Sequence, residues 1–444
     1  MFSHPFRSTR SADDHATARS ETPTGLSAAF TSLEHPDYRT LWWGGLFSFL
    51  SIQMQFLLRG ILAWELTERE GALGLVYLCF GVAMLIATPL GGVASDRFSK
   101  RMIIVLAQVA ITTFAVAMGL AVLFDVAEFW MLLVAAMVQG TAFGFFGPAR
   151  VAFSADLVGR AQLGNAIALS LLSMNGTRIF APSLAGVLAG WAFFGIGGAY
   201  LVAGVFSVVA LLFLLRLPAV KPVETSAKKL SPLAEIADGV RHVWSRPPLR
   251  RLVLSSFFIV MFGFNYVAFY PAMIEGQFGL DERWVGYISS ASALGAVAVA
   301  IPLASRANSS WAKPAMILGG LFFGVGVIAF GLSPNFWVAF AVIAFVGSAN
   351  TIYQTLSNTM ALSLADDSHQ GRVQSLMQLS FAGFGIAAAP LGLLAEITSL
   401  RVAIVFMGVV TLITATFYLI AEGGVGSVRD EAETLEAARD LVAA

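Results

Sequence analysis

Twelve apolar runs, each long enough to cross a lipid bilayer, recur along this chain of 444 residues. A helix rises 1.5 Å per residue, so about 20 apolar residues span the roughly 30 Å hydrocarbon core. Only 12% of the residues are charged and 57% are hydrophobic, whereas soluble domains carry about 25% charged residues. The sequence therefore predicts an all-α membrane protein with twelve transmembrane helices. We expect the spans near 41–64, 72–94, 102–124, 129–149, 165–190, 192–215, 252–274, 284–304, 314–333, 336–362, 373–396 and 402–421.

The distribution of basic residues predicts the orientation of these spans. With both termini on one side, that side receives most of the 27 Lys and Arg residues, and only Arg69, Arg283 and Arg401 fall in loops on the other. Basic residues stay on the cytoplasmic side of inserted helices. We therefore expect a multi-pass protein of the plasma membrane (the inner membrane of a bacterium) with both termini in the cytoplasm.

The longest polar break between spans divides the chain into two halves. Its stretch SPLAEIADGVRHVWSRPPLRR is amphipathic and predicts an interfacial helix on the cytoplasmic face. The first residues are polar and have no apolar signal-peptide core. The expected organisation is a disordered cytoplasmic N-tail at 1–38, a six-helix bundle at 39–217, a linker at 218–250, a second six-helix bundle at 251–421, and a C-tail at 422–444, predicted as a short solvated helix.

The two halves repeat each other at a shift of about 209 residues, which indicates duplication. Two six-helix halves related by an axis along the membrane normal are typical of transporters, in which the substrate site lies between the halves. The corresponding pairs are Arg97 with Arg306, Asp156 with Asp366, and Pro182 with Pro390.

The loop between spans two and three carries the strongest motif. It places an acid beside several bases at the ends of two helices, where Arg97 can reach Asp156, so it suits a conformational latch. The alternative is a positive-inside loop with a helix cap. This loop resembles the signature loop of the major facilitator superfamily, which implies two six-helix bundles that transport by rocking-type alternating access. The latch residues are Gly92, Asp96, Arg97, Lys100, Arg101 and Asp156.

Two further stretches narrow the resemblance to a branch of that superfamily. ADLVGRAQLGNAIALSLLSMNGTRIFAPSLAG and YPAMIEGQF, followed by Trp284-Val-Gly286, are similar to the drug:proton antiporter branch that includes the enterobactin exporter and macrolide efflux pumps. The resemblance implies proton-coupled export of a mid-sized amphipathic compound such as a siderophore, drug or metabolite. An importer or facilitator of small organic anions is the alternative. Ser305 stands where a second latch acid would fall, so only one strong latch is expected.

Buried charge in the expected spans marks the candidate substrate site, because charges in mid-membrane are costly and are functional hypotheses by default. Arg178 lies deep in span five, with Asn175 one turn earlier on the same face. It binds an anionic or strongly polar group, or it is a structural arginine tied to backbone carbonyls. Arg59 lies near the outer end of span one and either binds substrate or snorkels to the interface.

Spans seven and ten supply the other substrate-binding candidates, Asn265, Tyr266, Tyr270, Asn350, Tyr353 and Gln354. Aromatic rings and amides suit a flat amphipathic substrate. The alternatives are an interfacial tyrosine belt and hydrogen bonding between helices. Glu275 and Glu396, at the outer ends of spans seven and eleven, are candidate proton carriers or interfacial solvated acids.

Other classes of protein are disfavoured. The chain has 27 acidic and 27 basic residues, so it has no basic excess for nucleic acid. It has a single cysteine, Cys79, and no phosphate-binding loop. No catalytic constellation falls within the spans. We expect a monomeric transporter without enzymatic activity, metal or cofactor, whose partners are a small molecule, protons and the bilayer.

Overall fold

The computed structural model describes residues 31–159, 162–218, 232–304, 311–366 and 369–423. The expected tails therefore lie almost wholly outside the described residues, as do Arg306 and the first part of the linker. Within the described residues, twelve long helical segments fall on the twelve expected spans, and the predicted fold class is confirmed.

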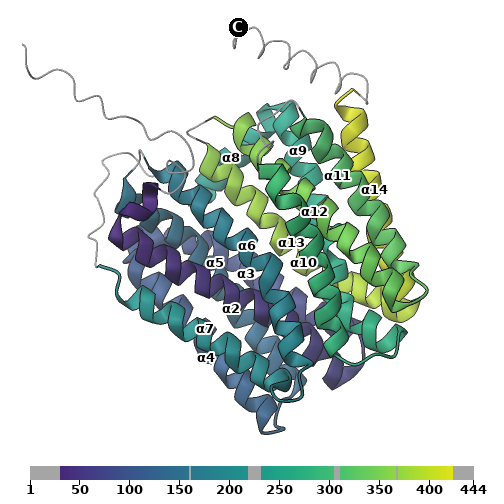
Figure 1. The fold of residues 1–444 in the computed structure, drawn as a ribbon. Coiled ribbons are helices and arrows are strands. Elements are labelled where there is room, and N and C mark those ends of the chain that lie inside the picture. Colours follow the sequence, from purple (N-terminus) through teal and green to yellow (C-terminus); the bar gives the residue numbers. More distant parts are fainter. Residues whose placement is uncertain (1–30, 160–161, 219–231, 305–310, 367–368, 424–444) are drawn as a thin grey trace, which may run out of the picture.

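The first half contains six helices and is drawn from purple to teal in Figure 1. A short 3-10 helix, η1 (Thr31–Glu34), precedes them. They are α2 (Pro36–Thr67), α3 (Glu70–Arg97), α4 (Lys100–Leu123), α5 (Phe129–Val158), α6 (Leu163–Ala189) and α7 (Gly195–Leu215).

The second half begins after the linker helix α8 (Pro232–Ser245), which lies in the amphipathic linker stretch. Figure 1 shows this half, mostly green to yellow, beside the first. Its spans are the composite span seven, which begins with α9 (Pro247–Phe258), then α10 (Arg283–Ala304), α11 (Ala312–Gly331), α12 (Phe336–Leu364), α13 (Gln370–Ile397) and α14 (Leu400–Ala421).

Most of these helices are long and apolar enough to span a membrane by themselves. Ten helices of the described chain meet this condition by length and composition, and α6 and α10 are the other two long ones. Polar side chains mark the ends of several helices: Ser99, Asn335 and Ser399 accept hydrogen bonds from backbone N–H groups in the first turns of α4, α12 and α14. Such caps satisfy donors that a helix end leaves unpaired.

Span seven is irregular instead of continuously α-helical. After α9 it passes through a π-helical turn η2 (Ile259–Gly263), a 3-10 segment η3 (Phe264–Phe269) and a second π-helical turn η4 (Ala272–Gln277). The sequence predicts one continuous span near 252–274 instead. Changes of helical period re-aim side chains, and π-turns are frequent at functional sites.

The two halves meet along two helix pairs, α3 with α13 and α6 with α10. We call the side that holds the start of α2, the α3–α4 turn and the end of α14 the terminal face, and the other side the opposite face. Contact is tightest toward the opposite face, where a Cβ added to Gly186 would lie 2.3 Å from the Cα of Gly286. Arg69 also pairs there with Glu396, at 3.1 Å. The halves are therefore closed at the opposite face.

Candidate functional site

A cavity of about 170 Å³ lies between the two halves, at the centre of the molecule. Its walls come from α2, α3, α5 and α6 of the first half and from span seven, α10, α12 and α13 of the second. The lining combines aromatic rings with amides and hydroxyls. A concave, mainly apolar site with a few polar groups, placed where two repeats meet, is the usual form of a transporter's substrate site.

Arg178 is the only charged residue among the described residues that line this cavity. Mid-helix in α6, it lies one turn beyond Asn175, which also lines the cavity. The guanidinium carbon lies 4.3 Å from the ring centre of Phe381 on α13, in the other half. This cation–π contact stabilises the charge from one face, and the guanidinium borders the open space. The site therefore presents one positive charge in an aromatic, amide-rich chamber.

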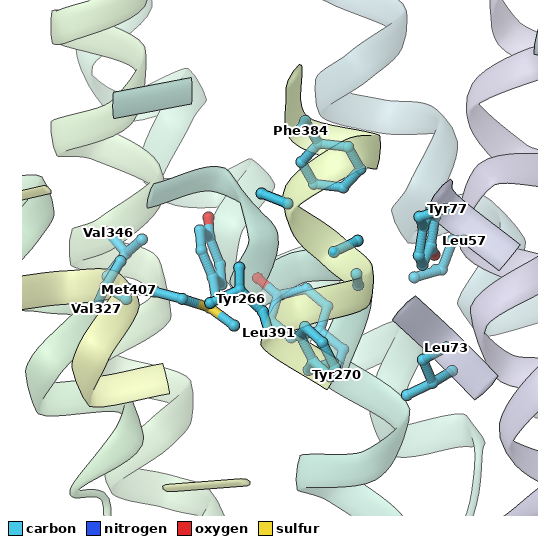
Figure 2. Close-up of a cluster of buried hydrophobic side chains, with 14 of the residues drawn as sticks. Leu57, Leu73, Tyr77, Tyr266, Tyr270, Val327, Val346, Phe384, Leu391 and Met407 are labelled. Carbon is cyan, nitrogen blue, oxygen red and sulfur yellow. The ribbon is translucent and has the colours of Figure 1, made fainter. Parts of the chain in front are cut away.

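The structure brings together six of the nine predicted substrate-binding residues. Arg178, Asn175, Tyr266, Tyr270, Asn350 and Gln354 all line the cavity. Tyr266 and Tyr270 also pack with each other, with ring centres 5.6 Å apart. Both belong to the same buried hydrophobic cluster as Val327, Val346 and Met407, which Figure 2 shows, so the two tyrosines connect the cavity lining to the core of the second half.

Asn265 and Tyr353 lie outside this lining. The side chain of Asn265 is buried and donates hydrogen bonds to the backbone oxygens of Met261 and Phe384. The hydroxyl of Tyr353 is 3.0 Å from that of Ser256. Both residues therefore tie helices of the second half together, the interhelical alternative considered above for span ten.

Arg59 also lies outside the lining, buried inside the first half. Its side chain donates to the carbonyl oxygen of Gln55 and to the side-chain oxygen of Gln139, and its guanidinium lies 5.3 Å from the ring centre of Phe80. Arg59 is only 2% exposed. The side chain is thus directed into the bundle, which contradicts the snorkelling alternative.

Three lining residues on α13, Gln378, Phe381 and Phe384, were not predicted. Gln374 and Gln378 are one turn apart in an otherwise apolar span, and this spacing was a usable signal because two amides on one face rarely point at lipid. Phe381 carried no such signal. Its importance depends on Arg178, which is far away in the sequence.

At the terminal face, Arg97, Lys100 and Arg101 of the expected latch lie at the turn between α3 and α4 and Asp156 lies on α5, but the pairing differs from the prediction. Lys100 contacts Asp156 at 2.5 Å, whereas Arg97 was expected to do so. Arg97 ends α3 and is exposed, and Lys100 begins α4, directly beside the last turns of α5. Arg101 donates to the carbonyl oxygen of Leu215 at 2.7 Å. The remaining latch residues, Gly92 and Asp96, lie on α3, and the Asp96 side chain is outside the described part of the chain.

The linker helix α8 is tied to the second half by a cluster of charged side chains. Asp366 pairs with Arg246 at 2.6 Å, and Asp238 pairs with Arg372 at 2.5 Å. Between these pairs, the rings of His242 and His369 stack with centres 4.0 Å apart. The Asp366 carboxyl accepts a hydrogen bond from Arg246, which lowers the pKa of Asp366 below its ordinary value.

The two candidate proton carriers lie at the opposite face. Glu275 is half-buried and lies beyond Pro247–Phe269, the long apolar part of span seven. Burial and nearby acids, chiefly Glu282, raise the pKa of Glu275 to about 8. Glu396 accepts hydrogen bonds from the side chain of Arg69 and from the backbone N–H of Gly71.

A protein with two six-helix halves, closed at one face around a central polar cavity, has the construction of a secondary membrane transporter. The sequence matches the profile of the Major Facilitator Superfamily over residues 41–281 and 252–440. The chain belongs to this superfamily, and it is a multi-pass membrane transporter.

Relatives and solved structures agree with this assignment. Proteins named enterobactin exporter EntS from Shigella boydii and Escherichia coli are 26% identical over 365 residues, covering 81% of this chain and 85% of theirs. The fold matches a bacterial homologue of the human lysosomal transporter Spinster, crystallised inward-facing and unoccupied, with a TM-score of 0.66, 17% identity and coverage of 92% and 99%. It also matches the nucleoside transporter NupG, with a TM-score of 0.62, 13% identity and coverage of 87% and 99%.

Proposed function

We propose that this transporter exports a mid-sized amphipathic organic anion by alternating access, in exchange for protons. The observation that carries the proposal is the position of Arg178, a single positive charge at the edge of an aromatic cavity between the halves. An anionic group on the substrate gains charge-assisted hydrogen bonds from the guanidinium. Its flat apolar part packs on rings such as those of Tyr266 and Phe384.

The terminal face is the cytoplasmic one in this proposal, which places both termini in the cytoplasm and the protein in a bacterial inner membrane. The basic loops support this orientation through the positive-inside rule. With the opposite face closed, this conformation takes up substrate from the cytoplasmic side. The enterobactin exporters related to this chain support the outward direction and a siderophore, drug or metabolite as cargo.

Proton coupling needs a titratable group whose environment changes when the halves rock. The described cavity lining contains no carboxylate, so we place the proton carriers at the opposite face, in Glu275 and Glu396. The raised pKa of Glu275 supports its role, because a carrier must bind and release protons near the operating pH. In the same scheme, the α3–α4 loop works as a latch that closes when the terminal face closes.

Transport by the purified full chain in proteoliposomes tests the proposal. Aromatic sulfonates and carboxylates are offered beside neutral and cationic compounds of matched size, with and without an imposed proton gradient. We expect counter-gradient movement of the anions only, and its loss in Arg178→Gln. Gradient-independent equilibration would identify a facilitator, and transport of cations alone would exclude the anion assignment.

A further inference from the structure

A second, smaller cavity adjoins the central one. Its volume is about 40 Å³, and it shares part of its lining with the central cavity. The shared residues come from α6, α12 and α13, so both halves contribute to the junction. They are Met174, Asn175, Arg178, Gln354, Gln378 and Phe381.

The smaller cavity lies between this junction and the terminal face. On α6 its additional residue is Leu171, and on α13 it is lined by Gln374 and Met377, all nearer to the starts of these helices than the shared residues. On α12 it extends to Asn358, nearer the end of the helix. Those helix ends are at the terminal face. The junction therefore lies on the terminal-face side of the central cavity, away from the closed opposite face.

Arg178 and Phe381 face each other at this junction across the two halves. A guanidinium that rests on a ring keeps its N–H donors in its own plane, pointing away from the stacked face. The neighbouring amides of Asn175, Gln354 and Gln378 offer further donors. No acid is among the described residues that line either cavity. The junction thus attracts anions and repels cations.

We propose that Arg178 and Phe381 form an anion-selective neck through which substrate passes between the terminal face and the central cavity. Arg178 supplies the charge, and Phe381 is a positioning residue that holds the guanidinium plane. The neck admits compounds that carry a flat anionic group, and it thereby determines the substrate class. This inference rests on the proposed function, since it assigns the entry step of the same cavity, but it concerns access and not export.

Thiol labelling measures access without a known substrate. In full-length Cys79→Ser protein, one cysteine is placed inside the neck, Ser292→Cys, or outside it, Asn358→Cys; these residues line only the larger and only the smaller cavity, respectively. Each variant reacts with an anionic sulfonatoethyl or a cationic trimethylammonioethyl methanethiosulfonate. The measured quantity is the ratio of anionic to cationic labelling rates at each position. The outer position corrects for the intrinsic reactivities of the reagents.

We expect the rate ratio inside the neck to exceed the ratio outside by about tenfold, given one uncompensated charge within a few ångströms of the path. Arg178→Gln should remove this excess. Phe381→Leu should reduce it several-fold, and Phe381→Tyr, which keeps an aromatic face, should retain it. The two Phe381 substitutions leave the Arg178 charge in place, so their comparison remains informative if the Arg178→Gln protein does not fold.

Equal ratios at the two positions would overturn the neck, as would an excess that survives Arg178→Gln. A Ser292→Cys thiol that reacts with neither reagent would also overturn it, because the route would then be shut. None of these results depends on export, since a protein that fails the proteoliposome assay can still show charge-selective labelling. The neck and the proposed function can therefore fail separately.

Discussion

Arg59 and Arg178 are both arginines within spans, but their different surroundings indicate different roles. Arg59 is buried among Gln139, Phe80 and the carbonyl oxygen of Gln55, all in the first half. Arg178 touches a ring of the other half and borders open space. A charge buried inside one half moves with that half as a rigid body. A charge at the boundary between the halves changes its surroundings at each transport step.

Glu275 gives a prediction at the residue scale. Because the closed state raises its pKa to about 8, that state binds the proton more tightly than an open, hydrated one. This contribution to closure is fully present below the ordinary glutamate pKa of about 4.3 and is lost as the pH rises through about 8. We expect the opposite face to open as the pH rises from about 7 to about 9.

Spin labels at the exposed positions Phe124→Cys and Leu332→Cys, one in each half at the opposite face, report that opening as a longer distance by pulsed electron resonance. Glu275→Gln should remove the pH response. Glu396→Gln tests the other candidate carrier in the same way, and a pH response that persists in it assigns the titration to Glu275. A wild-type distance that does not change between these pH values would contradict the prediction.

Sequence reasoning found Arg178, Asn175, Asn350 and Gln354 because polar groups deep in an apolar helix need partners or water. It could not separate these from Tyr353, because helical spacing does not say which neighbour a face meets. The break in span seven adds to this difficulty, since its π and 3-10 turns shift the side-chain register. Phe381 was beyond reach because its contact with Arg178 joins helices about 200 residues apart.

At the scale of elements, α6 and α10 touch through two glycines. A Cβ on Gly286 would lie 2.3 Å from the carbonyl carbon of Gly186, a distance at which backbone must move. We expect Gly286→Ala to force these helices apart and to shift the transporter toward the state open at the opposite face. The same two spin labels should show a larger long-distance population.

Gly176→Ala is the matched control for that experiment. Gly176 lies on α6 with nothing within 4 Å of an added Cβ, so the substitution changes only helix propensity, by about 1 kcal/mol in favour of the helix. Its distance distribution should equal that of the unchanged protein. If both alanine variants behaved alike, backbone contact between α6 and α10 would not be what closes the opposite face.

The linker helix α8 gives a second prediction at this scale. Burial and the neighbouring His369 and Arg246 lower the pKa of His242, against the weaker opposing pull of Asp366 and Asp238. The docked helix therefore binds fewer protons than the free one. The free energy that holds α8 on the second half should therefore fall as the pH drops below about 6.5, the ordinary histidine pKa. The decrease is complete below the lowered pKa that His242 has in the docked helix.

Hydrogen exchange over Pro232–Ser245, corrected for intrinsic rates, should show less protection at about pH 5.5 than at about pH 7.5. His242→Gln keeps a polar side chain and should flatten this difference. The Asp366–Arg246 pair does not interfere, because an acid with a lowered pKa titrates only at lower pH. Equal protection of α8 at the two pH values would rule out a histidine-dependent dock.

Over the whole molecule, the polar and backbone contacts differ between the two faces. At the opposite face they join the two halves, through the glycine contacts and through Arg69 with Glu396. At the terminal face, Lys100 with Asp156 joins helices within the first half, and the α8 cluster joins the linker to the second half. The asymmetry identifies the opposite face as the closed gate and leaves the terminal face as the side from which the neck is reached.

A reversible cross-link across the opposite face tests this asymmetry. The side chains of Arg69 on one half and Glu396 on the other meet at 3.1 Å, so cysteines in their places can be joined by a short bifunctional methanethiosulfonate. In Cys79→Ser protein, cross-linked Arg69→Cys with Glu396→Cys should block transport, since alternating access requires both faces to open in turn. Labelling of Ser292→Cys from the terminal face should continue, and reduction should restore transport. Transport that persists in fully cross-linked protein would show that the halves do not rock about a gate at the opposite face.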